Sequence, residues 1–487
     1  MSPSATSVTA SHTAAAPNVK VPSHSLSGRA CRTSPARRGA HRAPYRPTRP
    51  GVRARRTGAL PYTRPVTPRA AAEAPAEPAL PAPVGRLLAA LAGAGHEAVV
   101  VGGSLRDLCL GRPVSDWDVA TAAAPEAVLA LFPRAIPIGL RHGTVMVPSA
   151  AGPIDVTTYQ GTGGLAGDLA RRDFTVNAMA LAVPLDGSGE RAGAARWIDP
   201  AGGLADLRAG RLRAVGDAGA RLDEDPLRAL RALRLAAELD LALDPALAEA
   251  IRARAPSLRR VAAERVRAEL ERLLLAPGAA GALWQLRALG LEEALTGALA
   301  ADAPAVVGAL APELTLRLAG WLRGRDAAAL LARLRFPRAR TEAVARLVRL
   351  HPIERAAAPG DLGRLLVRIE ARGVEALLAL RAAEIAVGSL APVEAATVAE
   401  ALAALQLALE RLERAGVLPD GRPRLAVSGR EVMDWLGSGP GPRVGRALRY
   451  LTEQVLEEPS RNEPDALRRL LEAWAAAVPP PAPPPRG

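Results

Sequence analysis

Two carboxylates that are one residue apart, Asp116 and Asp118, are the side chains of this 487-residue chain with the clearest chemical potential. On a β-strand the side chains at positions i and i+2 share a face, so the two carboxylates converge while Trp117 points the other way into packing. Hard oxygen ligands in this arrangement suit Mg²⁺ and a nucleoside triphosphate. Taken alone, an Asp-x-Asp pair is more often a solvated strand edge, so the surrounding sequence has to decide.

The sequence before the acidic pair is typical of a phosphate-binding turn. The apolar run VVVGG (99–103) predicts a buried strand over 97–101 that ends in two glycines, which let a phosphate approach the backbone closely. Leucines spaced among polar residues predict a short helix over 104–110, and a second strand is predicted over 115–120. A strand, a Gly-Gly turn, a helix and a strand with paired Asp together indicate nucleotide transfer.

Six segments extend this pattern in order along the chain. They are GGSLRDLCLGRPVSDWD, RRDFTVNAMA, IDPAGGLADLRAG, EDPLRALRALRLAAEL, AAERVRAELERLLLAP and, further on, LAVSGREVMDWLGSGPGPRVGRALRYLTEQVLEEPSRNEPDAL. The chain thereby resembles the class II tRNA nucleotidyltransferases and bacterial poly(A) polymerases of the polymerase beta superfamily. The segments are similar to that family's first and second motifs, its connection from head to neck, its base-selecting motif, the helix after it, and the tail of its bacterial members.

The resemblance implies a catalytic set and a nucleotide-binding set. Asp116 and Asp118 would be catalytic and would hold Mg²⁺ as the cofactor, with Asp155 as a third catalytic carboxylate. By sequence alone, a lone Asp near a turn such as Asp155 is more often a solvated residue. The implied nucleotide-binding set is Gly102, Gly103, Arg106, Arg172, Asp173, Asp225, Arg228, Arg231 and Arg234.

Within the second motif, the resemblance assigns Arg172 to the triphosphate and Asp173 to the ribose, whose 2′ hydroxyl can donate to a carboxylate. Gly103 and Arg106 would also hold the triphosphate. From the residues alone, this segment would be a charged helix start. Asn177 is predicted to tie backbone segments together.

Asp225 and Arg228 carry the information for base selection. Their i, i+3 spacing on a helix over 224–239 would place the two side chains side by side on one face. A carboxylate accepts from an exocyclic amine while a guanidinium donates to a ring nitrogen or carbonyl, so the pair would admit cytosine and adenine and reject uracil and guanine. Arg231 and Arg234 continue the stripe and, by the resemblance, reach the nucleotide. Without the other motifs, an ordinary helix with an Arg face in salt bridges would be favoured.

The rest of the chain predicts an α+β fold. A helix is predicted over 84–92 and another after Pro125, and strands over 143–147 and 154–159 would form a hairpin across SAAG. The resemblance implies an N-terminal nucleotidyltransferase head with a small mixed sheet, followed by an all-α neck, body and tail. The predicted limits are 1–83 for a disordered basic leader, 84–215 for the head, 216–277 for the neck, 278–419 for the body, 420–476 for the RNA-binding tail and 477–487 for a disordered Pro-rich end.

Composition and charge limit the function classes. Residues 1–72 carry +13 of the formal net charge of +14, so the remainder is close to neutral and RNA contacts must come from an uneven distribution of charge. No apolar run approaches the roughly twenty residues that cross a bilayer, and two cysteines build no disulfide framework. These features predict a soluble, cytoplasmic protein without an obligate protein partner. The basic leader resembles an organelle transit peptide, although a dispensable tail or a misassigned start is favoured.

The function implied by the resemblance is addition of CCA, or part of it, to tRNA 3′ ends from CTP and ATP, without a template, with body and tail gripping the acceptor stem and elbow of tRNA. Two departures matter: Gln160 replaces a usual Arg, and GTGGLAGDLA (161–170) is shorter than the flexible loop of CCA-adding members. A short loop resembles the CC-adding members, so that activity is one alternative and poly(A) polymerase is another. A noncatalytic RNA-binding relative is the alternative from a different class, and it should have lost Asp116 or Asp118.

Overall fold

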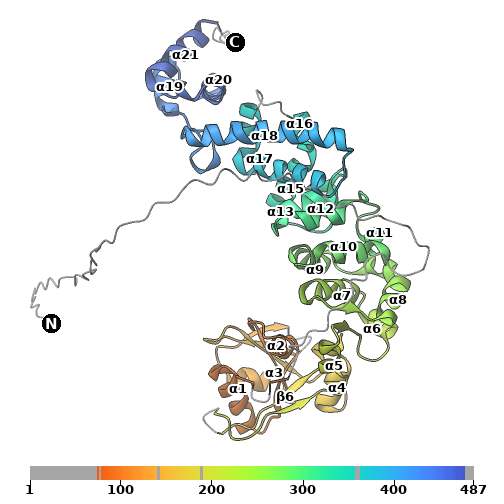
Figure 1. Ribbon diagram of the computed structural model, residues 1–487. Helices are drawn as coiled ribbons and strands as arrows, with labels where there is room; N and C mark the ends of the chain where they lie inside the picture. The colour runs from red at the N-terminus through yellow and green to blue at the C-terminus, as the bar shows by residue number, and fades with distance from the viewer. Residues whose placement is uncertain (1–73, 76–77, 140–142, 187–189, 357–361, 478–487) are drawn as a thin grey trace, which may run out of the picture. The chain divides into compact units, whose positions relative to one another are not determined.

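The computed structural model describes residues 74–75, 78–139, 143–186, 190–356 and 362–477. The predicted leader, apart from a few residues before the first helix, and the predicted Pro-rich end lie outside these residues, so both stay predictions, as do the cytoplasmic location and its organelle alternative. The fold is α+β, which confirms the predicted class: a mixed sheet in the N-terminal part is followed by helices (Figure 1).

The sheet has seven strands in the order β3-β4-β5-β2-β1-β6-β7. Strands β2 and β5 are parallel, and the other neighbours are antiparallel. The bounds are Ala98–Val101 for β1, Trp117–Thr121 for β2, Ile136–Gly139 for β3, Thr144–Val147 for β4, Ile154–Thr158 for β5, Ala180–Ala182 for β6 and Arg196–Ile198 for β7. A separate two-stranded ladder pairs β8 (Arg211–Leu212) with β9 (Ala242–Leu243).

Five short helices accompany the sheet: α1 (Ala82–Gly93), α2 (Gly103–Cys109), α3 (Pro125–Leu131), α4 (Gly164–Ala170) and α5 (Gly203–Arg208). Because side chains alternate along a strand, the two faces of the sheet bury different sets. Val100 and Val119 belong to the core into which α1, α2 and α3 pack, whereas Val101 and Ala120 pack with Leu169 of α4. Asp118 alternates with Val119 and therefore lies on the α4 face.

The structure confirms most predicted elements of the head to within two residues. The predicted hairpin is the antiparallel pair β4 and β5, with Val145 opposite Val156. Strand β3 was not predicted, because Ile136-Pro137-Ile138-Gly139 contains two residue types that are depleted in strands. It is an edge strand, and this is where proline is tolerated.

After the sheet, the described chain is helical apart from the β8–β9 ladder and its connections (Figure 1). The helices are α6 (Ala218–Glu224), α7 (Arg228–Leu239), α8 (Pro245–Arg254), α9 (Ala263–Leu275), α10 (Ala279–Ala288), α11 (Leu291–Leu295), α12 (Ala303–Ala309), α13 (Leu314–Leu322), α14 (Ala327–Arg333), α15 (Arg338–Leu350), α16 (Ile353–Ala356), α17 (Leu362–Ala386), α18 (Pro392–Arg414), α19 (Gly429–Leu436), α20 (Pro442–Glu457) and α21 (Pro464–Ala477). Their cores are aliphatic, as the composition of 49% hydrophobic and 3% aromatic residues predicts.

One helix departs from the prediction about apolar runs. Among the described residues, α18 is long and apolar enough to cross a membrane by length and composition alone. Its residues Val398, Leu402, Leu405 and Leu409 are buried in the protein core, and 22% of its apolar stretch is buried. A single helix of this kind does not establish a membrane span.

Candidate active site

The predicted carboxylates lie at one end of the parallel strand pair. Asp118 is in β2, Asp155 of β5 is its register partner, and Asp116 immediately precedes β2. Trp117 between the two aspartates is buried, as the alternation predicts. The Gly-Gly turn comes close to this end: a Cβ on Gly102 would lie 2.8 Å from Asp118 Oδ2, and Gly102 has φ 78°. A side chain at this position would both clash with the carboxylate and strain the backbone.

The electrostatics of the site favour binding of a positive charge. Burial raises the pKa of Asp118, and the neighbouring charges of Asp155 and Asp116 raise it further, while Arg172 and the backbone N–H of Gly103 lower it. Burial, followed by the charge of Asp116, raises the pKa of Asp155. A divalent cation bound beside the Gly102–Gly103 turn would relieve the repulsion between these carboxylates.

The donor set also indicates how a cation could be held. Within the described ranges, no three acidic, histidine or cysteine side chains form a ready-made coordination cage. An ion of the Mg²⁺ type is commonly bound by one or two carboxylates together with substrate phosphates and water. Asp116 and Asp118 are the pair that the sequence predicts for this role.

Arg172 lies beside the carboxylates and is held by Asp168. Its Nε and Nη2 donate to Asp168 Oδ2 at 3.2 and 3.1 Å, and a Cβ on Gly102 would lie 3.0 Å from its Nη1. Asp168 is 5% exposed, and its other oxygen accepts from the N–H of Gln160 at 3.1 Å. The buried carboxylate therefore fixes a guanidinium next to the Gly-Gly turn, where a phosphate would bind.

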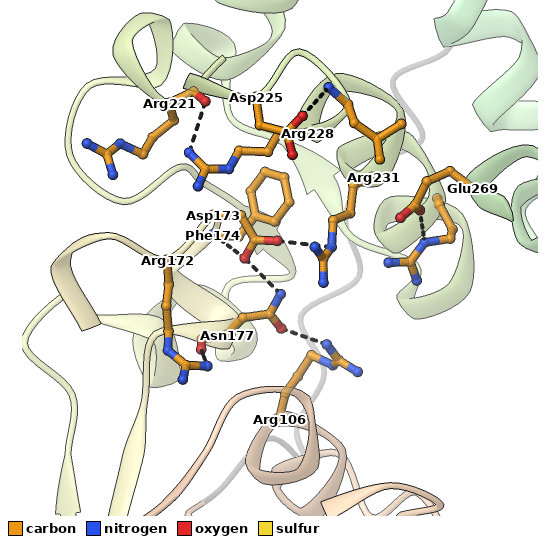
Figure 2. A network of polar contacts seen from close by, with 12 residues as sticks. Arg106, Arg172, Asp173, Phe174, Asn177, Arg221, Asp225, Arg228, Arg231 and Glu269 are labelled. Carbon is orange, nitrogen blue, oxygen red and sulfur yellow. Dashed lines mark hydrogen bonds and ion pairs between the residues drawn. The ribbon is translucent and has the colours of Figure 1, made fainter. Parts of the chain in front are cut away.

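Asn177 joins three of the predicted nucleotide-binding side chains (Figure 2). Its Oδ1 accepts from Arg106 Nη1 at 2.6 Å, its Nδ2 donates to Asp173 Oδ1 at 3.2 Å, and its backbone oxygen accepts from Arg172 at 3.3 Å. An amide can accept from a guanidinium and donate to a carboxylate at the same time, which few side chains can do. The prediction gave Asn177 a backbone role, and the sequence carries no signal of this wider one.

Asp173 connects the second motif to helix α7. Its Oδ1 also accepts from the N–H of Phe174 at 2.8 Å, and its Oδ2 lies 3.1 Å from Arg231 Nε (Figure 2). The charge of Asp173 is the largest of the effects that raise the pKa of Arg231. Arg231 is half-exposed, so its remaining N–H groups are available to a ligand.

The prediction of a continuous helix through Asp225 is wrong. Helix α6 ends at Glu224, Asp225 is extended with φ −146° and ψ 100°, and α7 begins at Arg228. The cause is Pro226, whose ring disfavours the helical conformation of the preceding residue. Asp225 and Arg228 are thus on a turn before the helix and in its first residue, and their proximity comes from that turn.

Arg234 is predicted to reach the nucleotide, and in the structure its side chain is buried between carboxylates. Its side chain is 4% exposed and is enclosed by the carboxylates of Glu238 and Glu269, so it joins α7 to α9. Arg228, Arg231 and Arg234 all form salt bridges, as in the alternative of an Arg face in salt bridges, but only Arg234 of the three is almost fully enclosed. Figure 2 shows Glu269 on the far side of Arg231 from Asp173.

Comparison with known families agrees with this geometry. A model of the poly(A) polymerase head domain matches residues 98–213, and a model described as the probable RNA and SrmB-binding site of polymerase A matches residues 240–301. The sheet, the turn and the carboxylates all lie in the first match. The fold and the site thus define a template-independent nucleotidyltransferase.

Comparison over the whole chain is more specific. The CCA-adding enzyme of Geobacillus stearothermophilus is 34% identical over 405 residues, which are 78% of this chain and 93% of that protein. The crystal structure of the Bacillus stearothermophilus CCA-adding enzyme in complex with CTP has a TM-score of 0.63 at 29% identity and covers 81% of this chain and 97% of its own. The Thermotoga maritima CCA-adding enzyme complexed with tRNA, at 20% identity, has a TM-score of 0.58, covers 82% of this chain and 97% of its own, and supports the fold alone. The chain belongs to the class II family of CCA-adding enzymes and bacterial poly(A) polymerases.

Proposed function

We propose that this protein adds cytidine and adenosine to the 3′ end of tRNA from CTP and ATP, without a template, and releases pyrophosphate. The observation that carries the proposal is the pairing of Asp118 with Asp155 across β2 and β5, against the Gly102 turn and Arg172. Membership in the family and a relative solved with CTP support the choice of substrate.

Different residues of this chain would bind the metal ion and the triphosphate. Asp116 and Asp118 would hold Mg²⁺, with Asp155 nearby, and the bound ion would lower the charge of the reacting phosphate and favour ionisation of the attacking hydroxyl. Arg172 and Arg106 would bind the triphosphate. In the reaction, the 3′ hydroxyl of the RNA loses its proton to solvent and its oxygen forms a bond to the α-phosphorus. The bond from that phosphorus to the bridging oxygen breaks, and the electron pair leaves with pyrophosphate.

Ribose and base would be recognised across the junction of α7 with the sheet. Asp173, which is held by Asn177 and Arg231, would accept from a ribose hydroxyl. Asp225 and Arg228 would read the amine and the acceptor that cytosine and adenine share. A pocket that leaves a carboxylate facing a carbonyl rejects uracil and guanine strongly, because the mismatched polar groups stay unpaired.

The short connection before the second motif supports CC addition as a second candidate function. Helix α4 occupies most of residues 161–170, and a Cβ on Gly167 would collide with the backbone carbonyl of Thr162. Asp168 further closes this segment by accepting from the N–H of Gln160. A segment folded this tightly on itself leaves no long loop to rearrange between incorporation of C and of A.

The test uses the full chain, Mg²⁺ and tRNA transcripts that lack their last three nucleotides, with each labelled nucleotide supplied alone and all four together. Incorporation of C, C and then A supports CCA addition, and C alone supports the second candidate. Long runs of A indicate a poly(A) polymerase. No incorporation with any nucleotide, by a protein that still binds tRNA, would refute both proposals in favour of a noncatalytic RNA-binding relative. Replacement of Mg²⁺ by other divalent ions after chelation identifies the metal.

A further inference from the structure

Asp225 and Arg228, the two side chains proposed to read the base, each form an ion pair with another residue. Asp225 Oδ2 accepts from Arg265 Nη2 at 2.7 Å, and Oδ1 accepts from Arg265 Nη1 at 3.4 Å. Arg228 Nη1 donates to Glu224 Oε2 at 2.7 Å and to the carbonyl of Arg221 at 2.9 Å.

Asp225 and Arg228 each bind another residue, although an aspartate and an arginine in one turn attract each other. The N–H of Arg228 donates to the carbonyl of Asp225 at 3.0 Å, so the two side chains begin within reach of each other. Left alone, a carboxylate and a guanidinium form a two-bonded pair that satisfies both. Such a pair would have neither an acceptor nor a donor to offer to a base.

We propose that Arg265 is a positioning residue for base selection: it holds the Asp225 carboxylate away from Arg228, with an acceptor site turned to the nucleobase. The inference rests on the proposed function, because it concerns the nucleotide that Asp225 reads. Arg265 acts through Asp225 and does not itself touch the base.

The acceptor sites of the carboxylate are consistent with this role. An ionised carboxylate has about four acceptor sites. The N–H of Leu227 occupies one site on Oδ1 at 3.2 Å, and Arg265 takes up one on each oxygen. The site that remains can accept from the exocyclic amine of cytosine or adenine. Donation to both oxygens also fixes the plane of the carboxylate, which a single point charge would not do.

Helix α9 gives Arg265 a fixed position. Arg265 is in the first turn of α9, forty residues after Asp225, and Glu269 one turn later is joined to the buried Arg234 of α7. The ion pair is therefore set by the packing of two helices. Arg265 itself is 55% exposed, so its replacement removes little from the core.

The experiment compares Arg265→Met with Arg272→Met as the matched control. Arg272 is on the same helix, is 61% exposed and also pairs with a carboxylate, that of Glu238. For each variant, kcat and KM are measured for CTP, ATP, UTP and GTP on a truncated tRNA transcript. We expect Arg265→Met to lower the ratio of kcat/KM for CTP over UTP by about tenfold or more, mainly through a higher KM for CTP, and Arg272→Met to leave the ratio unchanged.

Two further variants separate positioning from stability. Arg265→Lys keeps the positive charge but loses the two parallel N–H donors of the guanidinium, so an intermediate ratio of kcat/KM for CTP over UTP is expected. This variant serves as the test if Arg265→Met does not fold. In an Asp225→Ala background, Arg265→Met should have no further effect on the ratio.

An unchanged ratio in folded Arg265→Met, or a further change in the Asp225→Ala background, would overturn the inference while leaving the proposed function intact. Failure of the unaltered protein to add C or A would instead overturn the proposed function.

Discussion

Replacement of Glu384 by Gln should destabilise the helical body in a way that depends on pH. Glu384 is 8% exposed in α17, and it accepts from His351 Nε2 at 3.0 Å and from Arg381 Nη1 at 2.8 Å, while Arg323 Nε lies 2.9 Å from its other oxygen. Burial by itself would raise the pKa of Glu384, but the hydrogen bonds from His351 and Arg381 and the charge of Arg323 outweigh it and lower the pKa from 4.5 to about 2.

This shift sets the size of the effect. At about 1.4 kcal/mol per pKa unit, the drop from 4.5 to about 2 makes the ionised carboxylate worth about 3 kcal/mol to the folded state at pH 7. Because the folded pKa is the lower one, this contribution is fully present above pH 4.5 and is lost as the pH falls toward 2. By linkage most of this contribution remains at pH 4, and more than half of it is lost at pH 3.

The assay is urea unfolding at pH 7, 5, 4 and 3, followed by tryptophan fluorescence, with the fully buried Trp321 of α13 as the probe of the body. Glu384→Gln should lower the free energy of unfolding most at pH 7, and the difference from the unaltered protein should shrink as the pH falls. Glu342→Gln, which removes an exposed carboxylate paired with Arg338 on α15, is the control and should change little at any pH. An equal loss at pH 7 and pH 3 would refute the argument from charge, because it would mean that Glu384 acts through packing alone.

Four other variants test separate features of the fold and the site. Arg317→Met should cost about 2 kcal/mol or more in urea unfolding, because the buried guanidinium donates to backbone carbonyls at the ends of α9 and α12 that would lose their partner. Gly203→Ala should cost about 1 to 3 kcal/mol, since its Cβ would meet a backbone carbonyl, whereas Gly445→Ala, in open space on α20, should gain about 0.5 kcal/mol. Asp118→Asn should abolish nucleotide transfer yet raise the melting temperature of the metal-free protein at pH 7, because ionising a carboxyl with a raised pKa costs stability; a lower melting temperature would contradict this.

Local spacing was sufficient to predict part of the active site. Side chains alternate along a strand, so Asp116 and Asp118 point away from the buried Trp117 between them. This prediction needs no knowledge of the rest of the fold. The place of Asp155 opposite Asp118 depends on the register of β5 on β2, which brings together residues 37 apart. Only the family resemblance suggested Asp155, because no local pattern encodes a register between distant strands.

The partners that orient the site side chains were not predictable in the same way. Asp168 next to Arg172, and Arg265 next to Asp225, are charged residues in sequence segments full of other charged residues. Asp168 and Arg172 are four residues apart, so local spacing allows their ion pair, whereas the guanidinium that meets Asp225 is decided by helix packing and by the turn at Pro226. Because of that turn, the prediction of a helix at Asp225 is wrong. The sequence contained a signal for this, since a residue that precedes proline disfavours the helical conformation.

The arginines of α7 differ in their exposure and in their carboxylate partners, and neither property can be read from the sequence. Arg234 is 4% exposed between two acidic side chains, so its charge is already balanced and a phosphate would have to displace a buried ion pair to reach it. Arg231, one helical turn earlier, is 48% exposed and faces Asp173 at the edge of the site. A triphosphate can add to that partnership without breaking it, since a guanidinium has five N–H donors. Arg231 therefore stays a proposed nucleotide contact, while the ion pairs of Arg234 hold α7 against α9.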